Sequence, residues 1–109
     1  MSGRKYPLDT DKAAWENPTV DVYPPGVKEK ILWENPETGA TIIMIKYPEG
    51  VVGKNHTHSK ANEAGYYLQG EVEGQNVTGL FGVNSKGVEH GKARFTKETT
   101  VILSYDGPR

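Results

Sequence analysis

The sequence contains no cysteine, which excludes both a disulfide framework and thiolate metal ligands, so any metal site must use His, Asp or Glu. An excess of charge of one sign is also missing, because 13 Lys and Arg face 14 Asp and Glu and leave a net charge of -1. The electrostatic footprint of a nucleic-acid-binding protein is therefore absent. These absences favour a small-molecule partner and argue against nucleic acid.

Long apolar runs are lacking as well. The longest, residues 42–45, is far shorter than the roughly 20 residues that a membrane-spanning helix requires. Residues 1–15 are polar and charged and lack the apolar segment of a secretory signal. We therefore expect a soluble, cytoplasmic protein with no membrane partner. Its 109 residues predict a single domain, 1–109, in which residues 1–26 form an N-terminal arm or strand segment.

Glycine and proline, by contrast, are frequent and scattered, with 13 Gly and 7 Pro along the chain. Scattered turn residues between β-branched segments predict short strands joined by tight turns, and a turn is expected at residues 35–39. One short helical turn is expected near residues 9–16. The expected strands cover residues 27–33, 40–47, 64–69, 71–78 and 99–105. This pattern predicts an all-β sandwich or barrel.

The three histidines are the candidate metal ligands. His56 and His58 are two residues apart, so on a strand both imidazoles would project from the same face and could chelate one ion. Taken alone, such a pair is more often solvated than bound to a metal. The residues around the pair decide between these interpretations.

Glycines and one glutamate flank the histidine pair at fixed spacings. The first cupin motif is matched without a substitution by Gly50, His56, His58, Glu63 and Gly70. The second motif is matched in part by Gly79, Ser85, Gly87, His90 and Arg94, where Ser85 and Arg94 replace the usual Pro and Asn. Residues 50–94 therefore resemble the cupins.

The resemblance implies an all-β fold, the small cupin barrel, also called a double-stranded β-helix or jelly roll. It implies that His90 comes from a different strand and faces His56 and His58 across the barrel, and that the three hold one divalent metal ion. In many cupins the residue at the position of Glu63 is a fourth ligand, and in others it only orients a histidine. Fe(II) is favoured, and Zn, Ni or Mn would also suit these ligands.

Residues 81–92 are similar to the second-motif region of acetylacetone-cleaving dioxygenases, which bind Fe(II) through three histidines and no carboxylate. This likeness implies that Glu63 is not a ligand, and that O₂ and a small dicarbonyl or enol compound share the open metal positions. Residues 25–27 and 38–40 also resemble the cupins related to the ChrR anti-sigma factor. The two resemblances leave the subfamily open.

Three further residues are expected near the metal. Asn84 and Gln75 are neutral amides where the dioxygenases carry charged residues, and we expect both to donate hydrogen bonds to a bound substrate or water. Tyr66 and Tyr67 alternate faces on one strand, so one of them can face the metal. Asn84, Gln75 and Tyr66 are therefore the candidate residues around the ligands.

Three functions fit these features. The first is a mononuclear Fe(II) dioxygenase that cleaves a C–C bond in a small dicarbonyl or enol compound. The second is a non-oxidative isomerase, lyase or cyclase in which the metal polarises a carbonyl. The third is a non-catalytic metal- or small-molecule-binding module, which is less favoured because the sequence shows no second, regulatory domain. A homodimer is expected because so small a barrel benefits from burying more apolar surface.

Overall fold

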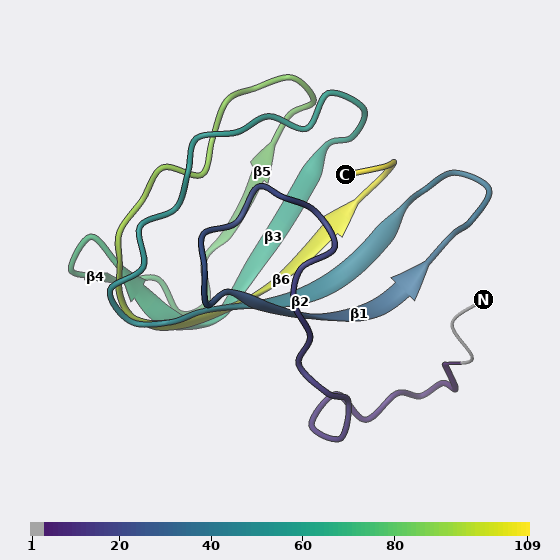
Figure 1. Cartoon of the computed structure of the whole chain (residues 1–109), viewed down its shortest axis with the longest axis horizontal. Helices are drawn as coiled ribbons and strands as arrows, with labels where there is room; N and C mark the ends of the chain where they lie inside the picture. The colour runs from purple at the N-terminus through teal and green to yellow at the C-terminus, as the bar shows by residue number, and fades with distance from the viewer. Residues whose placement is uncertain (1–3) are drawn as a thin grey trace.

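The computed structural model describes residues 4–109, and its strands form one antiparallel sheet (Figure 1). The described residues contain no helix, and accordingly none that is long and apolar enough to cross a membrane. The strands are β1 (Lys28–Glu34), β2 (Thr41–Tyr47), β3 (Glu63–Val72), β4 (Gln75–Asn76), β5 (Phe81–Asn84) and β6 (Phe95–Tyr105). The predicted all-β fold is confirmed.

The sheet has the order β1-β2-β6-β3-β4, and β5 pairs with β3 beside it. The last strand in the sequence, β6, thus lies at the centre, paired with β2 from Thr41↔Tyr105 to Tyr47↔Thr99. On its other side β6 pairs with β3, from Glu63↔Tyr105 to Val72↔Phe95. The centre of the sheet therefore joins segments that are far apart in the sequence.

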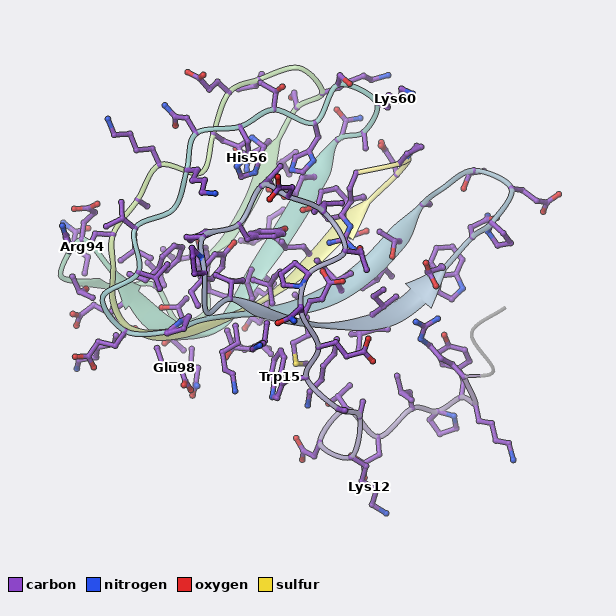
Figure 2. The ribbon with its side chains drawn as sticks, in the orientation of Figure 1. Lys12, Trp15, His56, Lys60, Arg94 and Glu98 are labelled. Atoms are coloured by element: carbon purple, nitrogen blue, oxygen red, sulfur yellow. The ribbon has the colours of Figure 1, made fainter. Side chains whose placement is uncertain are left out.

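Two loops form a second layer over one face of this sheet. In Figure 1 residues 51–62 and 85–94 run side by side above the strands, and residues 16–26 cross the same face. The two loops are joined by isolated antiparallel bridges at Val52↔Arg94 and His56↔His90. Figure 2 shows His56 on this side of the sheet and Trp15 on the opposite side. The fold is thus a sandwich of one regular and one irregular layer.

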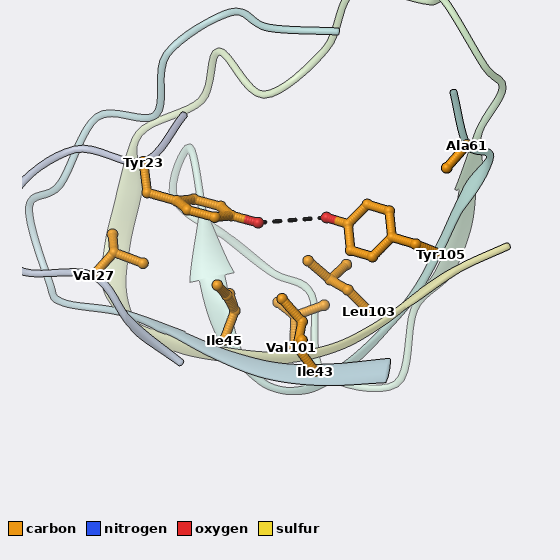
Figure 3. Packing of buried hydrophobic residues seen from close by; sticks show 8 residues of the cluster. All are labelled: Tyr23, Val27, Ile43, Ile45, Ala61, Val101, Leu103 and Tyr105. Carbon is orange, nitrogen blue, oxygen red and sulfur yellow. Dashed lines mark hydrogen bonds between the residues drawn. The ribbon is translucent and has the colours of Figure 1, made fainter. Parts of the chain in front are cut away.

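The apolar core fills the space between the layers (Figure 3). Strands β2 and β6 contribute every second residue to it, as the twofold side-chain period of a strand requires. The loops and the N-terminal segment close the core from above. Its buried members are Tyr23, Val27, Ile43, Ile45, Ala61, Val101, Leu103 and Tyr105.

A buried ion pair fastens the N-terminal segment to the sheet. The Arg109 guanidinium donates to both carboxylate oxygens of Glu29, at 2.8 Å and 3.3 Å, and to Thr19 Oγ1 at 2.9 Å. The backbone N–H of Thr19 also donates to Glu29 Oε2, at 3.2 Å. The Glu29 residue is only 1% exposed. These contacts hold residues 16–26 in place above the core.

The turn expected at residues 35–39 is confirmed, since the Gly39 N–H donates to the Asn35 carbonyl at 2.8 Å. The prediction of one strand over residues 71–78 is wrong. There β3 continues to Val72, and Glu73 and Gly74 reverse the chain with φ angles of 52° and 77°. The helical turn expected near residues 9–16 is confirmed only in part, because residues 9–12 form a single turn closed by a 3.2 Å bond from Lys12 N–H to Asp9 O and residues 13–16 do not continue it.

Candidate metal centre

The three histidines meet in the second layer. His56 and His90 lie opposite each other on a bridge, with backbone N–H to carbonyl distances of 2.8 Å and 2.9 Å. His58 is two residues farther along the same loop and is buried. One ring nitrogen from each histidine lies within 4.8 Å of the other two, so the three can hold one metal ion.

Two glycines allow the loops to approach so closely. A Cβ atom on Gly53 would lie 2.2 Å from the Gly91 carbonyl oxygen, which is a backbone atom and cannot move aside cheaply. At Gly91 the φ angle is +104°, and a Cβ atom would lie 2.6 Å from His56 Cε1. Glycine at these two positions therefore sets the distance between His56 and His90.

Backbone carbonyls orient two of the imidazole rings. His56 Nδ1 lies 2.8 Å from the Lys54 carbonyl oxygen, and His90 Nδ1 lies 3.0 Å from that of Val88. Because a carbonyl only accepts hydrogen bonds, each Nδ1 carries the proton and Nε2 keeps its lone pair. This is the tautomer that binds a metal through Nε2.

The Nε2 atoms of His58 and His90 are buried and have no hydrogen-bond partner among the described residues. Leaving a buried polar atom without a partner costs about 1–3 kcal/mol. A divalent ion between the rings would accept both lone pairs and remove this cost. The donor set therefore fits a metal ion.

The pKa of His56 also favours the neutral ring. Burial lowers this pKa, and the nearby His90 and His58 lower it further, while the hydrogen bond to the Lys54 carbonyl acts in the opposite direction. The net shift is downward from the ordinary value. Near neutral pH, His56 is therefore available as a ligand.

Glu63 lies beside the histidines at the start of β3 and is 7% exposed. Its two carboxylate oxygens lie 3.4 Å from His58 Nε2 and 3.4 Å from His90 Nε2. The Tyr105 hydroxyl donates to Oε2, and Asn84 Nδ2 donates to Oε1 at 3.0 Å. Burial raises the pKa of the carboxyl, but the contacts with these four side chains outweigh burial and lower the pKa to about 2. Glu63 is thus a carboxylate with both oxygens engaged.

The other candidate residues divide into two groups. Asn84 lines the cavity beside Glu63, but neither Gln75 nor Tyr66 lines it. Tyr66 is 45% exposed because the alternation along β3 turns Tyr67 toward the cavity and Tyr66 away from it. Gln75 is exposed in β4, beyond the turn at residues 73–74. The structure therefore brings Asn84 and Tyr67 to the histidines and leaves Gln75 and Tyr66 outside.

Two buried tyrosines belong to the site and were not among the candidates. The Tyr105 ring packs against that of His58 with centroids 4.9 Å apart, and its hydroxyl lies 3.4 Å from the Tyr23 hydroxyl. Burial raises the pKa of both tyrosines, so their hydroxyls stay protonated and can donate. The alternation of Val101, Leu103 and Tyr105 on one face of β6 is the sequence signal that could have identified Tyr105.

A cavity of about 220 Å³ adjoins His56, His90 and Glu63. Its apolar wall includes Tyr47 and Phe95, whose rings stack with centroids 3.9 Å apart. Ligand pockets for drug-sized molecules measure about 300–1,000 Å³, so this cavity suits a smaller compound.

The whole described chain, residues 4–109, matches the family model of the ChrR Cupin-like domain. The chain belongs to this cupin family. The resemblance of residues 50–94 to the cupins is therefore confirmed. No curated protein matches this cupin significantly in sequence.

Solved structures agree with this assignment. KdgF from Halomonas sp. is 27% identical with a TM-score of 0.68, and the match covers 93% of this cupin and 91% of that chain. An acetylacetone dioxygenase from Acinetobacter johnsonii is 19% identical with a TM-score of 0.68, over 98% and 76% of the two chains. The anti-sigma ChrR of Rhodobacter sphaeroides, solved in complex with SigE, is 20% identical with a TM-score of 0.65, over 90% and 52%. The last two likenesses show a shared fold.

Proposed function

We propose that this cupin binds one divalent metal ion through His56, His58 and His90, and that it acts on a small molecule bound beside the ion. The observation that carries the proposal is the pair of buried Nε2 atoms, on His58 and His90, that have no hydrogen-bond partner among the described residues. The tautomers of His56 and His90 and the adjoining cavity support it. Fe(II) is the favoured ion, and Zn, Ni or Mn would suit the same ligands.

The favoured reaction is cleavage of a C–C bond in a small dicarbonyl or enol compound by O₂. Fe(II) would supply Lewis acidity and electrons for the oxygen chemistry. The residues of the chain would position the substrate: Asn84 can hydrogen-bond one of its oxygens, and Tyr47 and Phe95 can contact its carbon skeleton. Similarity in fold to an acetylacetone dioxygenase is consistent with this reaction.

A non-oxidative reaction is the second candidate, in which the metal would polarise a carbonyl of the substrate and Glu63 would lie beside it. A buried carboxylate with a pKa of about 2 stays charged at neutral pH and lies at the edge of the cavity. Because this pKa is far below neutral and both oxygens already accept hydrogen bonds, Glu63 is a weak base, and it would orient His58 and His90 while the metal polarises the carbonyl. Isomerisation or β-elimination would then proceed without O₂.

Metal analysis followed by oxygen uptake tests these functions. The protein is purified without added metal, its metal content is measured, and a panel of β-dicarbonyl compounds is supplied. We expect about one iron per chain and O₂ consumption that depends on the compound. Bound metal with conversion but no O₂ uptake would favour the non-oxidative reaction. Bound metal with neither conversion of the compound nor O₂ uptake would favour a non-catalytic binding module.

Replacing Glu63 with Gln distinguishes a fourth ligand from a neighbouring carboxylate. Both oxygens of Glu63 already accept hydrogen bonds, from Tyr105 and Asn84, so we expect three histidines to hold the metal without it. The variant should keep close to full occupancy, while its affinity in chelator competition falls about 10- to 100-fold because histidine orientation is disturbed. Loss of the metal during purification of the variant would instead show that Glu63 is a ligand.

Metal retention should fall in acid. Imidazole coordinates in its neutral form, so protons compete with the ion as the pH drops through and below about 6.5. The pKa of His56 is already lowered, and bound metal lowers it further, so release should begin below that value. Dialysis at stepped pH with metal analysis measures this. Full occupancy at a pH of roughly 3 would contradict histidine ligation.

We also propose a homodimer that forms through the β5 edge of the sheet. Large apolar side chains are exposed there on the paired strands β3 and β5 and at the position just before β5, namely Tyr66, Leu68, Leu80, Phe81 and Val83. An exposed apolar strand edge is a favourable surface for pairing with a second chain. Light scattering of the purified protein should therefore give about twice the mass of one chain.

A further inference from the structure

The two loops that carry the histidines are much more basic than the rest of the chain. Residues 51–62 and 85–94 contain five basic residues and one acidic residue, in a chain whose net charge is -1. A concentration of one charge sign around a cavity attracts small ions of the opposite sign. Two of these five basic residues line the cavity.

Lys54 and Lys92 both line it. The bridges Val52↔Arg94 and His56↔His90 share one register, so the position midway between them pairs Lys54 with Lys92. Each lysine is two residues from a histidine of its own loop, and between the bridges the loops are joined by a 2.7 Å bond from the Gly53 N–H to the Ala93 carbonyl. Both lysines therefore border the cavity beside the His56↔His90 bridge, and both are exposed to solvent.

These lysines occupy matching positions of the two loops without a counter-charge. Among residues 4–109, no acidic side chain forms an ion pair with either of them. Like charges directly opposite across a pair of extended segments are destabilising. The acidic residue of the cavity, Glu63, is engaged by Tyr105 and Asn84 instead. A bound anion would relieve the repulsion between the lysines.

We propose that the substrate of this site carries a carboxylate, which Lys54 and Lys92 bind while another oxygen of the same molecule faces the histidines. The inference rests on the proposed metal site and adds the chemical class of its substrate. The apolar wall of Tyr47 and Phe95 favours an organic anion over an inorganic one. The volume of about 220 Å³ limits the substrate to a small organic acid.

Two probes with the same metal-binding end test this inference. 4,6-Dioxoheptanoate and heptane-2,4-dione share a β-dicarbonyl group, but only the first has a carboxylate at its far end. Binding to the metal-loaded protein is measured by calorimetry at low ionic strength. We expect 4,6-dioxoheptanoate to bind at least about fivefold more tightly than heptane-2,4-dione, because two partly exposed ion pairs contribute about that much, and this preference should shrink in high salt.

The variants Lys54→Gln and Lys92→Gln should each reduce the preference, and the double variant should abolish it without changing the affinity for heptane-2,4-dione. Lys60→Gln is the matched control, because Lys60 is on the same loop as Lys54, does not line the cavity, and lies apart from His56 in Figure 2. Equal affinity for the two probes, no binding of either, or an equal effect of Lys60→Gln would overturn the inference while the metal site stands. Absence of metal from the native protein would instead overturn the proposed function, and the inference with it.

Discussion

Replacing His58 with alanine is expected to leave the purified protein almost without metal. A site with three protein ligands loses a third of its donor set, and even side chains that only orient a ligand contribute about 10- to 100-fold in metal affinity. We therefore expect a loss of more than about 100-fold. The same result is expected for His56→Ala and His90→Ala, since all three ring nitrogens converge within 4.8 Å.

Metal content per chain, measured after purification without added metal, checks this prediction. Thr57→Ala is the matched control, because Thr57 lies between the two ligands of the first loop but is exposed. Circular dichroism of each variant shows whether the sheet is intact. Near-normal occupancy in a folded histidine variant would remove that residue from the site.

Replacing Glu29 with alanine should strongly lower the free energy of unfolding. Glu29 is 1% exposed and is paired with Arg109, so the substitution leaves a buried guanidinium without its counter-charge. Removing one partner of a buried ion pair costs about 3–5 kcal/mol. Domains have only about 5–15 kcal/mol of stability in total, so much of it would be lost.

Urea unfolding of native and variant protein measures the change. Glu34→Ala is the control on the same strand, because Glu34 pairs with Arg4 at 3.1 Å in an exposed position and should contribute less than about 1 kcal/mol. Equal midpoints for the Glu29 and Glu34 variants would show that the buried pair does not fasten residues 16–26 to the sheet.

The grouping of the three histidines was predictable from sequence because it depends on local periodicity and on a motif with fixed spacing. His56 and His58 are two residues apart and therefore lie together on one loop, and the second motif predicts His90 as the third ligand. Asn84 was predictable for the same reason, since it directly precedes the second loop and pairs with Glu63 across β3 and β5. These positions follow from the order of residues within short segments.

Other features depend on contacts that no short segment reveals. The prediction of a strand over residues 71–78 was wrong because Glu73 adopts a positive φ of 52°, which the sequence does not indicate for a residue other than glycine. Gln75 consequently follows a reversal of the chain and lies at the edge of the sheet. Tyr105 reaches Glu63 because β6 pairs beside β3, a contact between residues 42 positions apart. Tyr23 meets Tyr105 across 82 positions.

The irregular upper layer has a consequence for motion. Its two loops are joined to each other by isolated bridges at Val52↔Arg94 and His56↔His90, whereas β2 and β6 share an unbroken ladder of seven residue pairs. Amide hydrogens of the loops should therefore exchange with solvent through local opening, and those of β2 and β6 only through global unfolding. A ligand that bridges His56 and His90 would slow exchange at the loop amides selectively, which would make the loops a direct reporter of occupancy.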